Sequence, residues 1–135
     1  MKVGLNLFLW TGHATEVLRP ELELIAATGF DGVEVPAFDA SDPGHYRRLG
    51  ALLDELGLQR MVCSAVTAPG QNPVAPDAAE REAAFDQVRR VAECTAALGG
   101  THVVGPLYQP LGVFTGSPPT EAEQELCARF LSDLG

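Results

Sequence analysis

The sequence predicts an α/β fold of four consecutive strand–helix units, the arrangement of one half of a parallel barrel. Apolar, β-prone segments alternate with segments whose apolar residues recur every three or four positions. The helix-to-strand turns are short and contain glycine, whereas the strand-to-helix loops are longer. Strands joined through helices run parallel with right-handed crossovers, and long loops at one rim are typical of β/α folds whose site lies at that rim.

The first two units follow this pattern. Residues 3–10 form an apolar segment whose only strongly polar member is Asn6, and residues 20–28 have helical spacing. Residues 32–36 form the second strand, and Asp42-Pro43 starts a second helix, which spans 42–57 and ends at a glycine. The apolar positions of the two helices are Leu22, Ile25, Ala26, Tyr46, Leu49, Leu53 and Leu56.

The third and fourth units have longer loops, rich in proline and glycine. The third strand spans about 60–66, and its helix begins with a capping-box-like segment at 77–80. The fourth strand spans 101–107, and a capping box at 120–123 starts a helix that continues to the end of the chain. The apolar stripes of these helices are Phe85, Val88, Ala92, Leu98, Leu126, Cys127, Phe130, Leu131 and Leu134.

The polar residues of the first two strands favour a barrel over an open doubly wound sheet. Asn6 lies on the face of its strand opposite the leucines, and Glu34 lies opposite two valines. Polar residues suit the lumen of a barrel, whereas the strands of a doubly wound sheet are apolar on both faces. The doubly wound fold also has a glycine-rich phosphate turn after its first strand, and residues 10–14 contain a single glycine.

Composition excludes several classes of function. The net charge is −9, with 18 acidic against 9 basic residues, and the Arg47–Arg48 pair is too small a basic cluster for nucleic-acid binding. There is no apolar run of the ~18 residues that a membrane span needs. The N-terminal apolar run is too short for a secretory signal, so we expect a cytoplasmic protein. Three widely spaced cysteines, Cys63, Cys94 and Cys127, predict free thiols rather than disulfides or a zinc site.

Four short segments carry a resemblance to a known family. They are Lys-Val-Gly-Leu-Asn at 2–6, Gly-Phe-Asp-Gly-Val-Glu-Val at 29–35, Leu-Gly-Leu followed by Met-Val-Cys at 56–63, and Ala-Leu-Gly-Gly at 97–100. The chain resembles the N-terminal half of the xylose-isomerase-like TIM barrels, and among them the sugar-phosphate isomerase/epimerase group with its ketose 3-epimerases. The resemblance implies that residues 1–135 form one half-barrel, a parallel (β/α)4 half of a TIM barrel that is truncated relative to a full (β/α)8 domain.

The resemblance implies a metal-dependent enzyme acting on a small sugar or sugar phosphate. In that family a carboxylate removes a proton next to a carbonyl, and Mn, Mg or Co stabilises the enediolate. The metal ligands, two Glu, one Asp and one His, come from strands five to eight, as do the acid/base carboxylates. No catalytic residue and no metal ligand is therefore expected in this chain, and the chain alone is expected to be inactive.

The resemblance further implies that this half supplies the wall of the substrate pocket. By position, Asn6 and Cys63 correspond to residues of the pocket, and Trp10, Pro106 and Tyr108 lie near the same rim. The residues themselves leave alternatives open: Cys63 either lines the pocket or is a small buried side chain, and Trp10 either stacks on a sugar ring or plugs the barrel.

Glu34 and the three histidines have their own alternatives. If Glu34 points into the lumen, it either hydrogen-bonds to substrate or is tied to neighbouring groups of the barrel. His13, in the first strand-to-helix loop, is a possible further site residue. His45, in the first turn of the second helix, is expected to be exposed to solvent. His102, at the start of the fourth strand, is expected to have no catalytic role.

Other functions remain as alternatives. Strands one and four are unpaired edges, so the chain could be a non-catalytic half-barrel that binds a partner or forms a homo-oligomer, through these edges or through the surfaces of a complete barrel. A dehydratase or a hydroxypyruvate-type isomerase would look alike in this half. A relative of the abasic-site endonucleases is disfavoured, because these take histidine ligands from the first half, and residues 36–38 and 63–65 contain none.

Overall fold

The computed structural model describes residues 1–135, which divide into two compact units. The first unit comprises Met1–Ser64 and Val91–Val104, and the second comprises Ala65–Arg90 and Gly105–Gly135. The long helix α3 (Ala78–Leu98) contributes its C-terminal part to the first unit and its N-terminal part to the second. No helix combines the length and the apolar character needed to cross a membrane.

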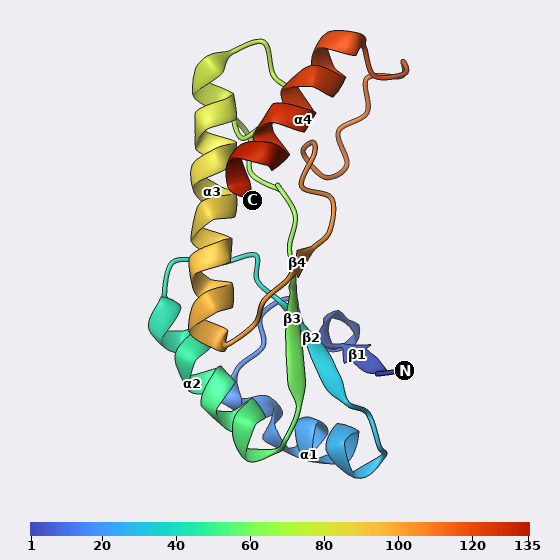
Figure 1. The fold of residues 1–135 in the computed structure, drawn as a ribbon, viewed down its shortest axis with the longest axis vertical. Coiled ribbons are helices and arrows are strands. Elements are labelled where there is room, and N and C mark those ends of the chain that lie inside the picture. Colours follow the sequence, from blue (N-terminus) through green and yellow to red (C-terminus); the bar gives the residue numbers. More distant parts are fainter. The chain divides into compact units, whose positions relative to one another are not determined.

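A four-stranded parallel sheet is the frame of the first unit (Figure 1). Its strands lie side by side in chain order, with α1 (Arg19–Ala27), α2 (Pro43–Glu55) and α3 between them in the sequence. This alternation of parallel strands and helices confirms the predicted α/β half-barrel. The strands are β1 (Gly4–Asn6), β2 (Gly32–Pro36), β3 (Gln59–Cys63) and β4 (Val103–Val104).

The helices pack on one face of this sheet, where apolar side chains of helices and strands form a single core. Each buried side chain of this kind contributes about 1.5–3 kcal/mol to the stability of the fold. The predicted apolar faces of α1 and α2 are confirmed by the burial of Leu22, Ile25, Tyr46, Leu49 and Leu53. Their partners in the core include Val33, Val35, Val62, Val91, Cys94 and Leu98.

The other face of the sheet carries its polar side chains. The register pairs Asn6 with Glu34, Glu34 with Met61, and Pro36 with Cys63, so these residues share one face. Asn6, Glu34 and Cys63 are only partly buried there. Because neighbouring positions alternate between faces, the predicted placement of Asn6 and Glu34 on the lumen side is confirmed. The residues on the opposite, helix-covered face are Val33, Val35 and Val62, all buried.

The Gly-Phe-Asp-Gly segment builds the amino end of the sheet. Gly29 ends α1 with a φ of 92°, a conformation that favours glycine. The Asp31 side chain accepts the N–H of Val3 at 2.7 Å, and the Asp31 N–H donates to the Val3 carbonyl at 2.8 Å. A Cβ on Gly32 would collide with the carbonyl of Gln59 in β3. Sheet assembly therefore accounts for the residue types of this segment.

The first strand is shorter than predicted. β1 ends at Asn6 rather than at residue 10, because the Asn6 side chain accepts the N–H of Phe8 at 2.7 Å and starts a 3₁₀ turn, η1 (Leu7–Leu9). Within this turn Leu7 is fully buried, whereas the side chains of Phe8 and Leu9 are exposed. The two-residue alternation predicted for 3–10 therefore holds only as far as Asn6.

The third and fourth strands are also shorter than predicted. β4 has two residues, because Gly105, with a φ of 132°, and Pro106, which has no N–H, do not continue the ladder. β3 ends at Cys63 rather than at residue 66, because its neighbour β4 offers no partner beyond this point. The last backbone hydrogen bond between these two strands runs from the Ser64 N–H to the Val104 carbonyl at 3.0 Å.

The second unit is built from the N-terminal part of α3, the helix α4 (Glu121–Leu134) and two long loops. Its core comprises Val66, Ala84, Val88 and Phe130, and the ring of Phe130 meets that of Phe85 edge-on at 6.1 Å. The predicted capping box is confirmed. Thr120 Oγ1 accepts the N–H of Glu123 at 3.2 Å, and the Glu123 carboxylate accepts the N–H of Thr120 at 2.7 Å.

The predicted apolar stripes of α3 and α4 are wrong at two positions. Ala92 is exposed, because the buried stripe of α3 passes through Val91 and Cys94 instead. Leu131 is 47% exposed, since only Phe130 of α4 lies fully within the core of the second unit. The apolar periodicity identified both helices, but it did not fix which of two adjacent apolar residues faces the core.

Candidate functional site

Three polar side chains meet where β1, β2 and β3 approach their carboxyl ends. Asn6 ends β1, Glu34 is its partner in β2, and Cys63 ends β3. The Asn6 amide Nδ2 lies 4.0 Å from Cys63 Sγ as a donor, and the Glu34 carboxylate is close enough to Cys63 for its charge to raise the pKa of the thiol. The parallel register thus brings together three of the residues predicted to form a substrate wall, from positions up to 57 residues apart.

The environment of Cys63 keeps its thiol protonated. Burial, as the largest cause, and the negative charge of Glu34 together raise the pKa of Cys63 to about 11. A thiol must ionise to act as a nucleophile. Cys63 is therefore a neutral thiol at physiological pH.

Exposed aromatic rings follow directly after Asn6. The Phe8 ring contacts Phe38 at 5.5 Å between centroids in an edge-to-face arrangement, and Phe8 and Trp10 are 58% and 51% exposed. Trp10 follows η1 rather than ending a strand. Phe8 and Phe38 were not among the predicted site residues. Their signal was present in the sequence, because both lie within four residues of a polar strand position that was singled out.

His13 and His45 form a stacked pair, with ring centroids 4.7 Å apart. His13 lies in the loop after η1, as predicted, and its backbone forms an antiparallel bridge with Ala37. The expectation that His45 is solvent-exposed is wrong: it is 8% exposed. The loop after η1 returns over the first turn of α2, and the position of a residue in a first turn does not reveal such a cover.

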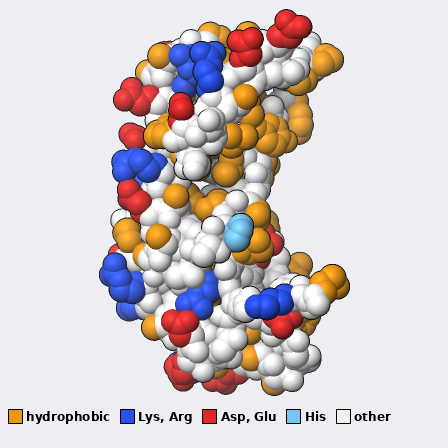
Figure 2. Space-filling view, in the orientation of Figure 1, with side chains coloured by type: hydrophobic (Ala, Val, Ile, Leu, Met, Phe, Trp, Pro, Cys, Tyr) orange, Lys and Arg blue, Asp and Glu red, His pale blue; other side chains and the backbone are white.

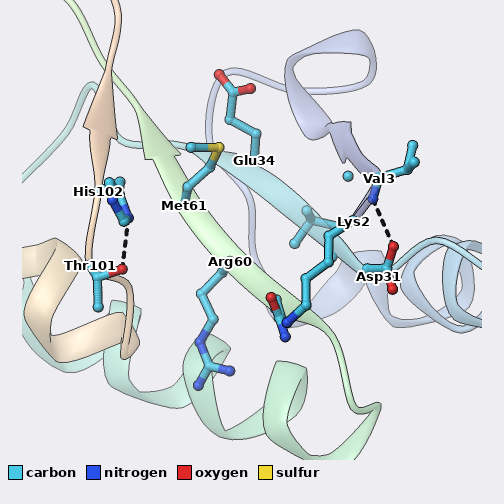
Figure 3. A pocket seen from close by; sticks show the side chains of 12 residues that line it. Lys2, Val3, Asp31, Glu34, Arg60, Met61, Thr101 and His102 are labelled. Atoms are coloured by element: carbon cyan, nitrogen blue, oxygen red, sulfur yellow. Dashed lines mark hydrogen bonds between the residues drawn. The ribbon is translucent and has the colours of Figure 1, made fainter.

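A depression of about 380 Å³ lies at the amino ends of the strands (Figure 3). In Figure 3 the Glu34 carboxylate points away from Lys2 and Arg60. Arg60 donates to the carbonyl of Leu98 at 3.0 Å and pairs with Asp54, so its role is to join α2 and α3 to β3. Thr101 and His102 bond to each other at 2.8 Å, so these side chains, like Asp31 and Arg60, have partners within the protein. The residues that line the depression include Lys2, Asp31, Gln59, Arg60, Thr101 and His102.

Two of the predicted site residues, Pro106 and Tyr108, belong to the second unit. Tyr108 is 51% exposed and borders a hollow of about 480 Å³ that Gln124 and Cys127 of α4 also line. Pro106 is partly buried. The proximity of these two residues to the strand ends of the first unit stays a prediction.

The charged groups do not form a metal centre or a basic patch. No group of three or more His, Cys, Asp and Glu side chains lies close enough together to hold a metal ion, so the donors in this chain do not by themselves fit the divalent metal implied by the resemblance. Basic side chains pair with local acids, as Arg19 does with Glu55 at 2.8 Å and Arg48 with Glu16 at 3.2 Å. On the face shown in Figure 2, acidic and basic side chains are interspersed.

Comparison with known proteins gives a consistent fold. Residues 22–135 match the family described as the xylose isomerase-like TIM barrel. The D-allulose 3-epimerase of a Methylomonas species, in complex with D-allulose, aligns with a TM-score of 0.83 and 20% identity, covering 99% of this chain and 46% of the epimerase. An L-ribulose 3-epimerase aligns with a TM-score of 0.85 and 23% identity, covering 99% of this chain and 45% of the epimerase.

A third solved structure is named as a 4-epimerase rather than a 3-epimerase. The 3-keto-D-glucoside 4-epimerase of E. coli aligns with a TM-score of 0.70 and 22% identity over 99% of this chain and 50% of the epimerase. The chain therefore spans about half the length of these solved proteins, which at such identities share its fold. No curated protein sequence matches the chain.

Proposed function

The chain belongs to the xylose isomerase-like TIM barrel family, and from this membership we propose that it forms the substrate wall of a sugar isomerase/epimerase. The reaction class is proton abstraction next to a sugar carbonyl. In this proposal residues 1–135 act as one half of a (β/α)8 barrel, and the half that performs the chemistry lies outside them. The three free cysteines suit a reducing compartment, so we place the protein in the cytoplasm.

One observation carries the proposal: Asn6, Glu34 and Cys63 are adjacent on the open face of a parallel sheet, at the end where β/α barrels bind their substrates. The amide of Asn6 can both donate to and accept from sugar hydroxyls, and the carboxylate of Glu34 can accept from two of them. One solved relative of the same fold was determined with D-allulose bound, which supports a ketose as the ligand.

The side chains of the wall would bind and orient the sugar rather than transfer protons. Phe8 and Trp10 offer exposed rings against which an apolar sugar face can pack. Cys63 stays a neutral thiol because of its raised pKa, so it does not compete as a nucleophile for the substrate carbonyl. Glu34 is next to Asn6 in the sheet register and its charge acts on Cys63, so it would be a binding group of the same wall.

The metal of such a barrel would be held by residues that this chain does not contain. No three His, Cys, Asp or Glu side chains of this chain lie close enough together to hold a metal ion. We propose Mn²⁺, Mg²⁺ or Co²⁺ as the ion of the complete barrel, where it would stabilise an enediolate. This half would contribute shape and hydrogen bonds beside that centre.

Ketose binding by the chain tests the proposal. In an NMR titration with D-allulose or D-fructose at millimolar concentrations, we expect saturable shifts at the amides of Asn6, Glu34 and Cys63. Glu34→Gln should weaken the binding roughly tenfold, because a hydrogen bond to a charged group contributes about 1.5–3 kcal/mol. Glu125→Gln, at an exposed position of α4, is the matched control. Saturable shifts confined to other residues, or none at all, would refute the proposal.

A second candidate function is a self-associating half-barrel. The observation in its favour is that β1 and β4 each pair with one neighbour only, so both edges of the sheet present free backbone groups. Homo-oligomerisation through these edges is compatible with a sugar-binding wall and does not require catalysis.

A further inference from the structure

The imidazole of His45 is a buried connector between two segments. Its Nε2 lies 2.8 Å from the carbonyl oxygen of Ala14, and since a carbonyl only accepts, Nε2 carries the proton. The ring stacks on His13 at 4.7 Å and meets the ring of Tyr46 edge-on at 5.0 Å. The Tyr46 hydroxyl in turn donates to the Asp39 carbonyl at 2.7 Å. A ring with these neighbours has a fixed position in the first turn of α2.

The other end of this connection is the loop of residues 10–15, which joins η1 to the next turn, η2 (Glu16–Leu18). Ala14, the residue bonded to His45, is 1% exposed, so the loop packs against the protein at this point. The bridge between His13 and Ala37 is a second attachment of the loop. Trp10, which begins the loop, is half exposed.

We propose that His45 is a positioning residue: its Nε2–H bond to Ala14 and its stacking on His13 hold the loop 10–15 in place, and with it Trp10, which begins this loop and belongs to the proposed substrate wall. His45 itself touches no substrate in this proposal. The importance of the loop for sugar binding rests on the proposed function, whereas the attachment of the loop by His45 does not.

Trp10 is the only tryptophan of the chain, so its fluorescence reports on whether the loop 10–15 is held in place. His45→Phe keeps a stacking ring but removes the donor, whereas His45→Gln keeps a donor near the position of Nε2. We expect His45→Phe to raise acrylamide quenching of Trp10 and to speed amide hydrogen exchange within 11–15 by about five- to tenfold, the factor expected for one lost hydrogen bond. His45→Gln should restore most of the protection. His102→Phe, at an exposed histidine of the amino rim, should change neither the quenching of Trp10 nor the amide exchange within 11–15.

A measurement on the unmodified chain covers the case in which His45→Phe fails to fold. Two-bond ¹H–¹⁵N correlation of the imidazoles at pH 8 distinguishes the tautomers, and we expect His45 in the Nε2–H form with a slowly exchanging proton. The Nδ1–H form, or a proton that exchanges as fast as that of exposed His102, would overturn the proposal. So would unchanged quenching and exchange in a folded His45→Phe variant.

The same samples separate this proposal from the proposed function. If His45→Phe loosens the loop and also weakens ketose binding, both stand. If it loosens the loop while ketose binding is unchanged, the positioning by His45 stands and the role of Trp10 in the sugar site falls. If the loop is unaffected, the positioning role falls whatever the ketose titration gives.

Discussion

At the scale of single residues, the chemistry of the open face depends on the effect of the Glu34 charge on the Cys63 thiol. Burial and the negative charge of Glu34 both raise the pKa of Cys63, so the thiol stays uncharged. Asn6 approaches the same sulfur from β1. The three residues therefore act as a unit whose parts should respond to one another when one is changed.

Removal of the Glu34 charge should make Cys63 more reactive. In Glu34→Gln the repulsion between carboxylate and thiolate is lost, so the pKa of Cys63 falls, though it stays above its ordinary value because burial, the larger cause, persists. At pH 9 the thiolate fraction, and with it the rate of alkylation by iodoacetamide, should rise several-fold. Mass spectrometry of the Cys63 peptide measures this rate separately from Cys94 and Cys127.

The control for this prediction is Glu23→Gln, at an exposed position of α1. Its Cys63 should alkylate at the rate of the unmodified chain. An equal or slower rate in Glu34→Gln than in the unmodified chain would show that Glu34 does not interact with Cys63.

The sequence was informative about residues on strands and less so about residues in loops. Strict alternation placed Asn6 and Glu34 on one face without any knowledge of tertiary contacts. The burial of His45 could not be inferred, because it results from a loop that is distant in sequence and returns over α2. The contact of Asn6 with Cys63 required the register of three strands, which local pattern does not fix.

At the scale of elements, a close approach of two helices defines the first unit. Gly50, in the middle of α2, is buried, and a Cβ there would collide with the backbone carbonyl of Leu98 at the end of α3. The adjacent Ala51 is exposed. Substitutions at Gly50 and Ala51 can therefore distinguish the effect of packing from that of intrinsic helix preference, because both positions lie in the interior of the same helix.

Gly50→Ala should destabilise the first unit, although alanine is the better helix former by about 1 kcal/mol. Overpacking of a tight contact costs about 1–3 kcal/mol and outweighs that gain. Urea unfolding measures the change. Ala51→Gly, the matched control, should cost about 1 kcal/mol by helix preference alone. A Gly50→Ala variant more stable than the unmodified chain would contradict the close approach of α2 and α3.

Helix boundaries were predictable because their signals are local. Asp42 caps α2 through a bond to the Gly44 N–H at 2.8 Å, and Thr120 caps α4 as its capping box predicts. Strand boundaries were less predictable, because a strand ends where its neighbour ends. Asn6 stopped β1 by a side-chain bond to the backbone, and the shortness of β4 limited β3.

At the scale of the whole molecule, the sheet has two free edges and an open face, and the solved proteins of the same fold are about twice as long. β1 has three residues and β4 has two, so each edge offers few hydrogen-bonding groups. Each edge nevertheless has an exposed apolar side chain. Val3, next to β1, is 46% exposed, and Val104, in β4, is 37% exposed. These features predict association.

Sedimentation velocity at micromolar concentrations should show a concentration-dependent dimer. The dimer should strengthen with added salt, because a net charge of −9 on each chain repels a second copy and salt screens that repulsion. Val104→Lys, which places a charge on the β4 edge, should shift the population to monomer. Val113→Lys, at an exposed loop position of the second unit, is the control. A monomer under all these conditions would count against edge association.

The central proposal is that the open face of these strands binds a ketose, while the catalytic residues belong to the other half of the barrel. The most direct test is conversion of a ketose panel, D-allulose, D-fructose and L-ribulose, by the purified chain with Mn²⁺, beside a full-length ketose 3-epimerase as positive control. We expect no conversion above the metal-only blank, while the full-length enzyme turns over. Clear epimerisation by the purified chain that Glu34→Gln abolishes would contradict the claim.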